Sequence, residues 1–303
     1  MTYTSRRAVG LALTTLTGLA AFIMVAMLAL ILLDVVANGA GHVTWEFLTQ
    51  PPSDGMMGGG IFPAIVGTAA LTLLMTLAVM PVGVLTAVYL HEYAPPGSRL
   101  ARWVRVAVVN LAGVPSIVFG LFGLGFFILF VGRGMDRMLG HEEMYWAQPG
   151  ILWASLTLAV LTLPVVIVST EEALRAVPLD HRTASLALGA TQSQTLARVV
   201  LPGALPGILT GTVLAISRGA GEVAPILFTG AAYFLPDLPS RLNSQFMHLG
   251  YHTYVLATQS PDVEATRPLL YATVLVLLLL TFALNLVAVI IRTRTRRKAA
   301  GAH

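Results

Sequence analysis

Long runs of apolar residues, separated by short polar segments, make up most of the chain. A helix needs about 20 mainly apolar residues to cross the hydrocarbon core of a membrane. The runs lack the alternation over about 10 residues that marks the strands of a membrane barrel. The pattern therefore predicts an all-α integral membrane protein with six transmembrane helices. The six runs cover residues 9–33, 61–90, 106–131, 151–170, 205–228 and 269–291.

Composition agrees with a chain that lies in the membrane. Hydrophobic residues make up 56% of the 303 residues and charged residues only 11%, whereas a soluble domain carries roughly 25% charged residues. We therefore expect no soluble domain. The chain has no cysteine, which excludes disulfides, thiolate metal sites and cysteine nucleophiles.

The basic residues predict the orientation, because cytoplasmic loops carry an excess of lysine and arginine. If the N-terminus is cytoplasmic, 13 of the 18 basic residues lie on the cytoplasmic side. Both termini are therefore predicted to be cytoplasmic. The basic excess then reports topology, and we expect the tail to meet anionic membrane lipid and not nucleic acid. The 13 residues are Arg6, Arg7, Arg99, Arg102, Arg105, Arg175, Arg182, Arg198, Arg292, Arg294, Arg296, Arg297 and Lys298.

The chain is predicted to have three parts. Residues 1–60 hold the first transmembrane helix and an external linker rich in proline and glycine, which makes this helix peripheral to the others. Residues 61–291 form a core of five helices, interrupted by a long cytoplasmic loop at residues 171–202. Residues 292–303 form a basic cytoplasmic tail.

The cytoplasmic loop is predicted to contain two short amphipathic helices. The first covers residues 171–177, and the second covers residues 180–189 with Asp180 as its N-cap. Gly189 suits a left-handed turn after this helix. Isolated helices below about 12 residues are marginal in water, so these two must pack against the bundle or against a partner subunit. The apolar side of the second helix is Ala184, Leu186, Ala187 and Leu188.

Two full charges, Arg218 and Glu222, interrupt the fifth apolar run. An arginine at the centre of a membrane helix costs about 3 kcal/mol on insertion scales. Glu222 follows one helical turn later on the same face, so the two charges neutralise each other. Pro225 is expected to kink the helix and to free the carbonyl of Gly221. A guanidinium matches a phosphate oxyanion bidentately, so the pair is a candidate anion site on a translocation path.

Glu222 is expected to hold Arg218 while the path is empty, and to accept a hydrogen bond from a protonated phosphate, which fully ionised sulfate cannot donate. The small residues Gly219, Ala220 and Gly221 would let a neighbouring helix or the substrate approach. A static ion pair that joins this helix to its neighbours is the alternative, and the sequence leaves both open.

Other polar residues that could form a site are interpreted as structural. His248 and His252 have the spacing of a helical metal pair, but no third ligand lies nearby, so we interpret them as part of a solvated external loop and predict no metal site. Glu171 and Glu172 are interpreted as helix-capping or subunit-docking residues and not as a catalytic acid pair.

Asn110 and Ser116 flank an expected kink at Pro115. They would either line the same path or bond neighbouring helices.

The cytoplasmic loop resembles the EAA loop of the permeases of ABC importers, whose pattern is E-A-A, three residues, G, nine residues and I-x-L-P. Thr183, Ala184 and Ser185 stand at the E-A-A positions and Gly189 follows at the family spacing, while Leu201 and Pro202 end the match. The sequence departs from the pattern at Thr183, which replaces the acid, at Ser185, and at Val199 in place of isoleucine.

Four further segments resemble the phosphate-specific permeases of the PstA type. These are GGGIFPAIVGT, YLHEYAP, NLAGVPSIVFGLFGLGFF and LAISRGAGEVAPILFTG, which together cover most of residues 58–230 in the family order.

The resemblance implies the fold of an ABC-importer permease in the inner membrane of a bacterium. It implies a subunit that carries phosphate, with Arg218 required, and that couples through the EAA-type loop to a separate ATPase. The implied partners are a homologous second permease chain, two ATPase copies that hold ATP and Mg²⁺, and an external phosphate-binding protein. The sequence itself excludes ATP binding through a P-loop, because that loop needs a lysine after its glycines and the only lysine here is Lys298, in the tail.

Two alternatives stay open. The substrate could be another oxyanion such as sulfate or molybdate, because an arginine alone does not choose among them. The chain could also be a proton-coupled secondary transporter in which Glu222 relays protons.

Overall fold

The computed structural model describes residues 3–53 and 58–300. Over these residues it is helical apart from turns, loops and a short antiparallel pair, β1 (Pro52–Ser53) and β2 (Gly58–Gly59). The long helices are α1 (Tyr3–Gly39), α3 (Phe62–Val88), α7 (Ile151–Arg175), α10 (Leu201–Ala220) and α12 (Val263–Ala300). The shorter ones are η1 (Ala40–His42), α2 (Trp45–Thr49), α4 (Arg99–Ala112), α5 (Ser116–Phe122), α6 (Arg133–Leu139), α8 (Leu179–Ala187), α9 (Gln192–Thr195) and α11 (Leu249–Thr258), with the π-helical segments η3 (Tyr89–Tyr93), η4 (Gly123–Gly132) and η5 (Leu196–Val200).

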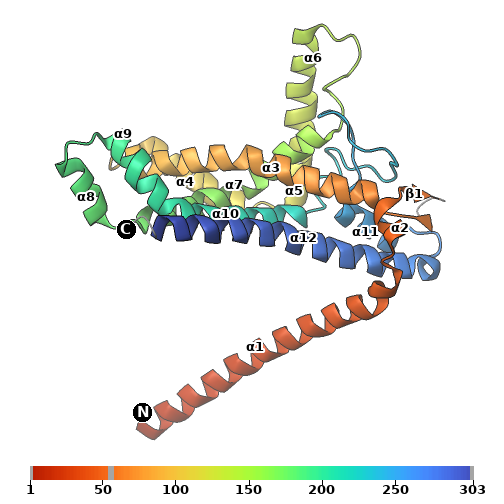
Figure 1. Ribbon diagram of the computed structural model, residues 1–303, viewed down its shortest axis with the longest axis horizontal. Coiled ribbons are helices and arrows are strands. Elements are labelled where there is room, and N and C mark those ends of the chain that lie inside the picture. Colours follow the sequence, from red (N-terminus) through yellow and green to blue (C-terminus); the bar gives the residue numbers. More distant parts are fainter. Residues whose placement is uncertain (1–2, 54–57, 301–303) are drawn as a thin grey trace.

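The prediction of six membrane-spanning helices is confirmed. Within the described residues, six helical stretches are long and apolar enough to cross a membrane, and an even number returns the chain to its starting side. Both chain ends lie toward the end of the molecule that carries α8, while α1 diverges from the bundle (Figure 1). The six stretches are Gly10–His42, Phe62–Tyr93, Ser116–Leu139, Ile151–Arg175, Gln192–Ala220 and Val263–Thr295.

Helix α7 is the most enclosed span. Of the 18 consecutive residues that are most apolar in this span, 67% are buried, against 39% for the span that contains α3. Small residues let its neighbours approach closely, which is how helices pack in lipid. A Cβ added to Gly83 of α3 would overlap Val166 of α7, and one added to Gly211 of α10 would overlap Ser169. The core of the protein therefore lies around α7.

Helix α1 contacts the rest of the chain mainly at its C-terminal end. Gly39 lies against the backbone of Tyr271 in α12, and the Tyr271 hydroxyl donates a hydrogen bond of 3.0 Å to Asp34. Only 6% of the most apolar window of this span is buried. Along the rest of its length α1 lies apart from the bundle (Figure 1).

The predicted third span, residues 106–131, is wrong at its start. Helix α4 ends at Ala112, and α5 begins a new helix at Ser116. Pro115 has no N–H to continue a helix and disfavours the helical conformation of the residue before it, so the expected kink is a complete break. The span then runs through α5, η4 and α6 to Leu139.

The predicted fifth span, residues 205–228, is wrong at both ends. The helical stretch begins at Gln192 and ends at Ala220, with Gly221 as the C-cap residue of α10. Pro225 therefore does not kink this helix. It lies in an irregular outer segment, where its backbone packs against Gly120 of α5.

This outer segment is tied to the N-terminal end of α7, whose first N–H groups have no partner inside the helix. The N–H groups of Gly150, Ile151 and Leu152 donate to the carbonyls of Thr229, Ser244 and Leu242 respectively, each at 2.9 Å. A Cβ on Gly230 would overlap the backbone of Gly150, so the backbones of these two segments are in direct contact. The outer end of α7 is capped in this way by the segment that follows α10.

The interpretation of His248 and His252 as residues of a solvated loop is wrong. His248 is the N-cap of α11, and its Nδ1 accepts a hydrogen bond of 3.1 Å from the Gly250 N–H. The two histidines are 0% and 5% exposed. The apolar segments before and after them pack the helix against α3 and α12, a tertiary effect that spacing along the chain does not reveal.

The two buried histidines should make the stability of the protein sensitive to acid. Burial lowers the pKa of both from 6.5 to about 4. They are neutral in the folded protein at neutral pH, whereas the unfolded chain takes up protons near pH 6.5. Stability should be complete above pH 6.5 and fall as the pH drops toward about 4, by up to roughly 3 kcal/mol for each histidine.

The measurement is the thermal unfolding midpoint of the purified chain in detergent across this pH range. Asparagine at 248 can still cap the helix but cannot titrate, so His248→Asn combined with His252→Gln should flatten the acid limb of the curve. His42→Asn, which changes an exposed histidine on the same side, is the control and should keep the parental slope. An unchanged slope in the double variant would contradict the prediction.

Candidate functional site

The predicted pair Arg218 and Glu222 lies where α10 ends. Arg218 is in the last helical turn, and the N–H groups of Gly221 and Glu222 bond back to the carbonyls of Arg218 and Gly219. The Arg218 Nε and the Glu222 Oε1 are 3.6 Å apart. The two residues are in contact as predicted, but Glu222 lies beyond the helix and not one helical turn further along it.

The pair is loose and accessible. The side chains of Arg218 and Glu222 are 45% and 21% exposed, and their separation exceeds normal hydrogen-bond distance. A guanidinium at the C-terminal end of a helix is stabilised by the helix dipole. The arginine therefore keeps donors available for an incoming anion.

Neighbouring residues fix the end of α10 and leave the Arg218 face open. A Cβ on Gly219 would overlap the Met75 Sδ of α3, so the glycine permits close contact with that helix. Ser217 donates a hydrogen bond of 2.8 Å to the Asn285 Oδ1 of α12. With α3 and α12 on the flanking faces, Arg218 occupies the face that the bundle does not cover.

The cytoplasmic loop has a different build from the prediction. Residues 171–175 continue α7 and do not form a separate helix, and Pro178 rather than Asp180 is the N-cap of α8. α8 ends at Ala187, and Gly189 has a φ of +85°, which confirms the expected left-handed turn. Thr191 and Gln194 then form a capping box that opens α9, and the sequence carries this signal in the spacing of three between the two residues.

The EAA-type positions lie along α8 and the start of α10. The hydroxyl of Thr183 bonds back to the carbonyls of Leu179 and Asp180, so it is satisfied within α8. Ser185 is within 2.9 Å of the Thr195 hydroxyl of α9. Ala184 is exposed on α8, and Leu201 and Pro202 open α10.

The apolar side of α8 is not covered by the described part of the chain. None of the α8 residues is buried, and Leu186 and Leu188 are 49% and 90% exposed. A groove of about 750 Å³ lies beside them, between α8, the end of α7 and the start of α10, with Val177, His181 and Arg198 among its lining. The region therefore presents an apolar surface on the cytoplasmic side.

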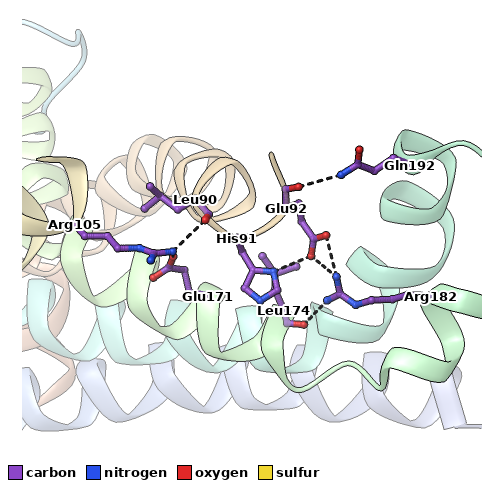
Figure 2. Close-up of polar contacts among 8 residues, drawn as sticks. All are labelled: Leu90, His91, Glu92, Arg105, Glu171, Leu174, Arg182 and Gln192. Atoms are coloured by element: carbon purple, nitrogen blue, oxygen red, sulfur yellow. Dashed lines mark hydrogen bonds and ion pairs between the residues drawn. The ribbon is translucent and has the colours of Figure 1, made fainter. Parts of the chain in front are cut away.

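The sequence did not reveal a polar network at the same end of the molecule. Arg182 of α8 bonds to Glu92 of η3, and Arg105 of α4 bonds to Glu171 of α7 (Figure 2). Arg182 and Glu92 are 90 residues apart, so no local spacing connects them. The one indication in the sequence that Glu92 matters was the segment YLHEYAP, which contains it and resembles the PstA-type permeases.

The described residues contain no cluster of three histidine, aspartate, glutamate or cysteine side chains that could hold a metal. The chemistry that the arrangement offers is anion binding at Arg218 and subunit docking around α8.

Comparison with known proteins gives the family. The model for binding-protein-dependent transport system inner membrane components matches residues 79–297. The chain is 32% identical over 265 residues to a probable ABC transporter permease protein, YqgI, of Bacillus subtilis (strain 168), covering 83% of this chain and 85% of that one. It is 33% identical over 273 residues to the phosphate transport system permease protein PstA 1 of Mycobacterium tuberculosis (strain ATCC 25618 / H37Rv), covering 87% and 82%.

A solved structure supports the fold. The chain resembles a chain in the crystal structure of a bacterial alginate ABC transporter in complex with an alginate pentasaccharide-bound periplasmic protein, with a TM-score of 0.63 and 16% identity over 97% of this chain and 96% of that one. Six apolar spans and a match over most of the sequence make this a multi-pass inner-membrane protein. The chain belongs to the family of binding-protein-dependent transport system inner membrane components.

Proposed function

We propose that the chain is a permease subunit of an ATP-driven importer and carries inorganic phosphate across the cytoplasmic membrane. The observation that carries the proposal is the Arg218 guanidinium, which lies on the open face of α10 beside Glu222. The relatives named as phosphate transport permeases support the choice of phosphate.

Arg218 would bind phosphate by releasing the carboxylate of Glu222 and bonding to the phosphate oxygens in its place. The 3.6 Å separation from Glu222 leaves the pair weakly bonded, and a planar guanidinium can donate two parallel hydrogen bonds to phosphate oxygens. While the path is empty, Glu222 balances the charge of Arg218. When phosphate arrives, it takes over the guanidinium donors.

Glu222 would also favour phosphate over sulfate. A carboxylate accepts a hydrogen bond from the proton of a protonated phosphate, whereas sulfate at neutral pH has no proton to donate and meets only charge repulsion. A site that hydrogen-bonds a substrate hydroxyl discriminates strongly against the analogue that lacks it.

A separate pair of ATPase subunits would supply the energy and hold ATP and Mg²⁺, and this chain would bind no cofactor. Its only lysine, Lys298, has no glycine-rich phosphate loop before it. The docking site for the ATPase would be the exposed apolar surface of α8, the adjoining groove and the EAA-type residues, of which Ser185 and Pro202 line the groove. These residues are Thr183, Ala184, Ser185, Gly189, Leu201 and Pro202.

A second permease chain and an external phosphate-binding protein would complete the complex. The apolar length of α1 is almost entirely uncovered, which suits a helix that packs on a second permease chain or on lipid. The alginate transporter cited above carries a periplasmic protein bound to its substrate, and an external protein of that kind would deliver phosphate here.

The alternatives are less well supported. A proton-driven secondary transporter does not fit a family whose members are components of binding-protein-dependent systems. Sulfate or molybdate as the substrate does not fit relatives named for phosphate transport.

Replacing Arg218 tests the substrate path. Arg218→Gln in the reconstituted complex should lower phosphate uptake by roughly 10- to 100-fold, the loss expected when a hydrogen bond to a charged group is removed. ATP hydrolysis stimulated by the binding protein should persist, because the α8 end is untouched. Radiolabelled phosphate uptake and ATPase activity are recorded together.

Three further variants sharpen this test. Arg218→Lys keeps the charge but not the bidentate geometry and should give an intermediate rate, whereas Arg241→Gln removes an exposed outer arginine and should match the parent. Glu222→Gln should lower the preference for phosphate over sulfate in competition. Parental uptake by Arg218→Gln would show that the pair is structural.

The exposed leucine of the docking surface tests the ATPase contact. Leu188 is 90% exposed, so Leu188→Asp should not affect folding of this chain but should weaken co-purification of the ATPase by about tenfold, as expected for the loss of one buried leucine. Leu139→Asp, on the outer side, is the matched control. Undiminished co-purification would rule out Leu188 as a docking residue.

A further inference from the structure

Glu92 is a charged residue at the cytoplasmic end of the span that contains α3. It lies in η3, the π-helical turn that closes this span before two prolines. Its side chain is 11% exposed, and π-helical turns are frequent at functional positions. Neither the proposed phosphate site nor the proposed docking surface uses this residue.

Arg182 of α8 joins Glu92 to the end of α7. Its Nη1 donates to both carboxylate oxygens of Glu92, at 2.6 and 2.9 Å, and its Nη2 donates to the carbonyl of Leu174 at 2.6 Å (Figure 2). The His91 Nδ1 lies 2.9 Å from the same carboxylate and, because the carboxylate can only accept, donates to it. A single arginine thus bridges two spans.

The bridge is stiff because it is short, charged and buried. The side chains of Arg182 and Glu92 are 15% and 11% exposed, so salt and water screen the pair weakly and neither group can be removed without leaving a buried charge. By contrast, the Arg105 side chain of the neighbouring pair is 51% exposed.

Further bonds hold the same turn from other elements. Gln192 of α9 donates to the backbone carbonyl of Glu92 at 3.0 Å, and Arg105 of α4 donates to the carbonyl of Leu90 at 3.1 Å. The turn η3 is therefore bonded to α4, α8 and α9, and through Arg182 to α7. A displacement of α8 would therefore be transmitted to the bundle through these bonds.

Helix α3 continues from this turn to the phosphate site. Met75 of α3 packs against Gly219, the residue next to Arg218. The contacts therefore form a continuous path from α8 through Arg182, Glu92 and α3 to the end of α10.

We infer that the Arg182–Glu92 pair is the rigid connection that transmits movement of α8 to α3 and α7, and so couples ATP hydrolysis to the opening of the phosphate path. The two are positioning residues that bind neither ATP nor phosphate, and the inference rests on the proposed function. The pair stays intact throughout the transport cycle, because a connection that broke would transmit nothing.

The test is a double-mutant cycle in the complete complex reconstituted in liposomes, with phosphate uptake and ATP hydrolysis measured in the presence of the binding protein. Glu92→Gln and Arg182→Gln should each lower the phosphate moved per ATP hydrolysed by at least about tenfold, within the range of measured coupling energies. The double variant should be no worse than either single one. Arg175→Gln, which removes an exposed arginine from the last turn of α7, should match the parent.

A covalent link separates coupling from mere stability. The chain has no cysteine, so Glu92→Cys with Arg182→Cys introduces its only two thiols, and a short thiol-to-thiol cross-linker can replace the ion pair. Cross-linking should restore the phosphate-to-ATP ratio that the unlinked cysteine variant loses.

Two results would overturn the inference while leaving the proposed function intact. The first is a parental ratio in Glu92→Gln or Arg182→Gln, and the second is a block of transport by the cross-link, which would mean that the pair must separate in each cycle. A parental complex that hydrolyses ATP without moving phosphate would instead overturn the proposed function and the inference with it.

Discussion

The packing of small residues around α7 is the constraint on which the rest of the structure depends. Lipid tails are as apolar as leucine, so helices in a membrane are held together by close contact and by hydrogen bonds and not by the hydrophobic effect. Gly83 and Gly211 bring α3 and α10 against α7 at Val166 and Ser169. The carbonyls of the outer segment cap one end of α7, and the Leu174 carbonyl at the other end accepts from Arg182. α7 is thus the fixed element against which both polar sites are positioned.

The spans were predictable from the sequence, but their ends were not. Hydropathy averages over a window and therefore finds each apolar stretch without sensing a break in the backbone. Gly113 to Pro115 break a stretch that is mainly apolar, and Gly221 ends α10 although mainly apolar residues continue to Phe228. The first break has a local cause, because Pro115 has no N–H to continue a helix and disfavours the helical conformation of the residue before it. After Gly221 the chain is held instead by close contacts with Gly120 and Gly150 and by hydrogen bonds to the start of α7, and such contacts have no signature in local sequence.

The same division holds for the functional residues. The contact of Arg218 with Glu222 follows from their spacing of four, which keeps the side chains near each other even though the helix ends between them. The burial of His248 depends on elements far away in the chain, and so does the bond between Glu92 and Arg182. Local periodicity can predict the first kind of contact and cannot predict the second.

The two arginine–carboxylate pairs differ in a way that matches different tasks. Arg218 and Glu222 are 3.6 Å apart and the arginine is 45% exposed, so the carboxylate can be exchanged for another anion at little cost. Arg182 and Glu92 approach to 2.6 Å with both side chains almost buried, so losing either partner leaves an uncompensated charge. In the function proposed above, the first pair would give way to the substrate and the second would stay intact while α8 moves. α3, which carries Glu92 in the turn at its end and contacts the residue beside Arg218 at Met75, is the element through which the second can act on the first.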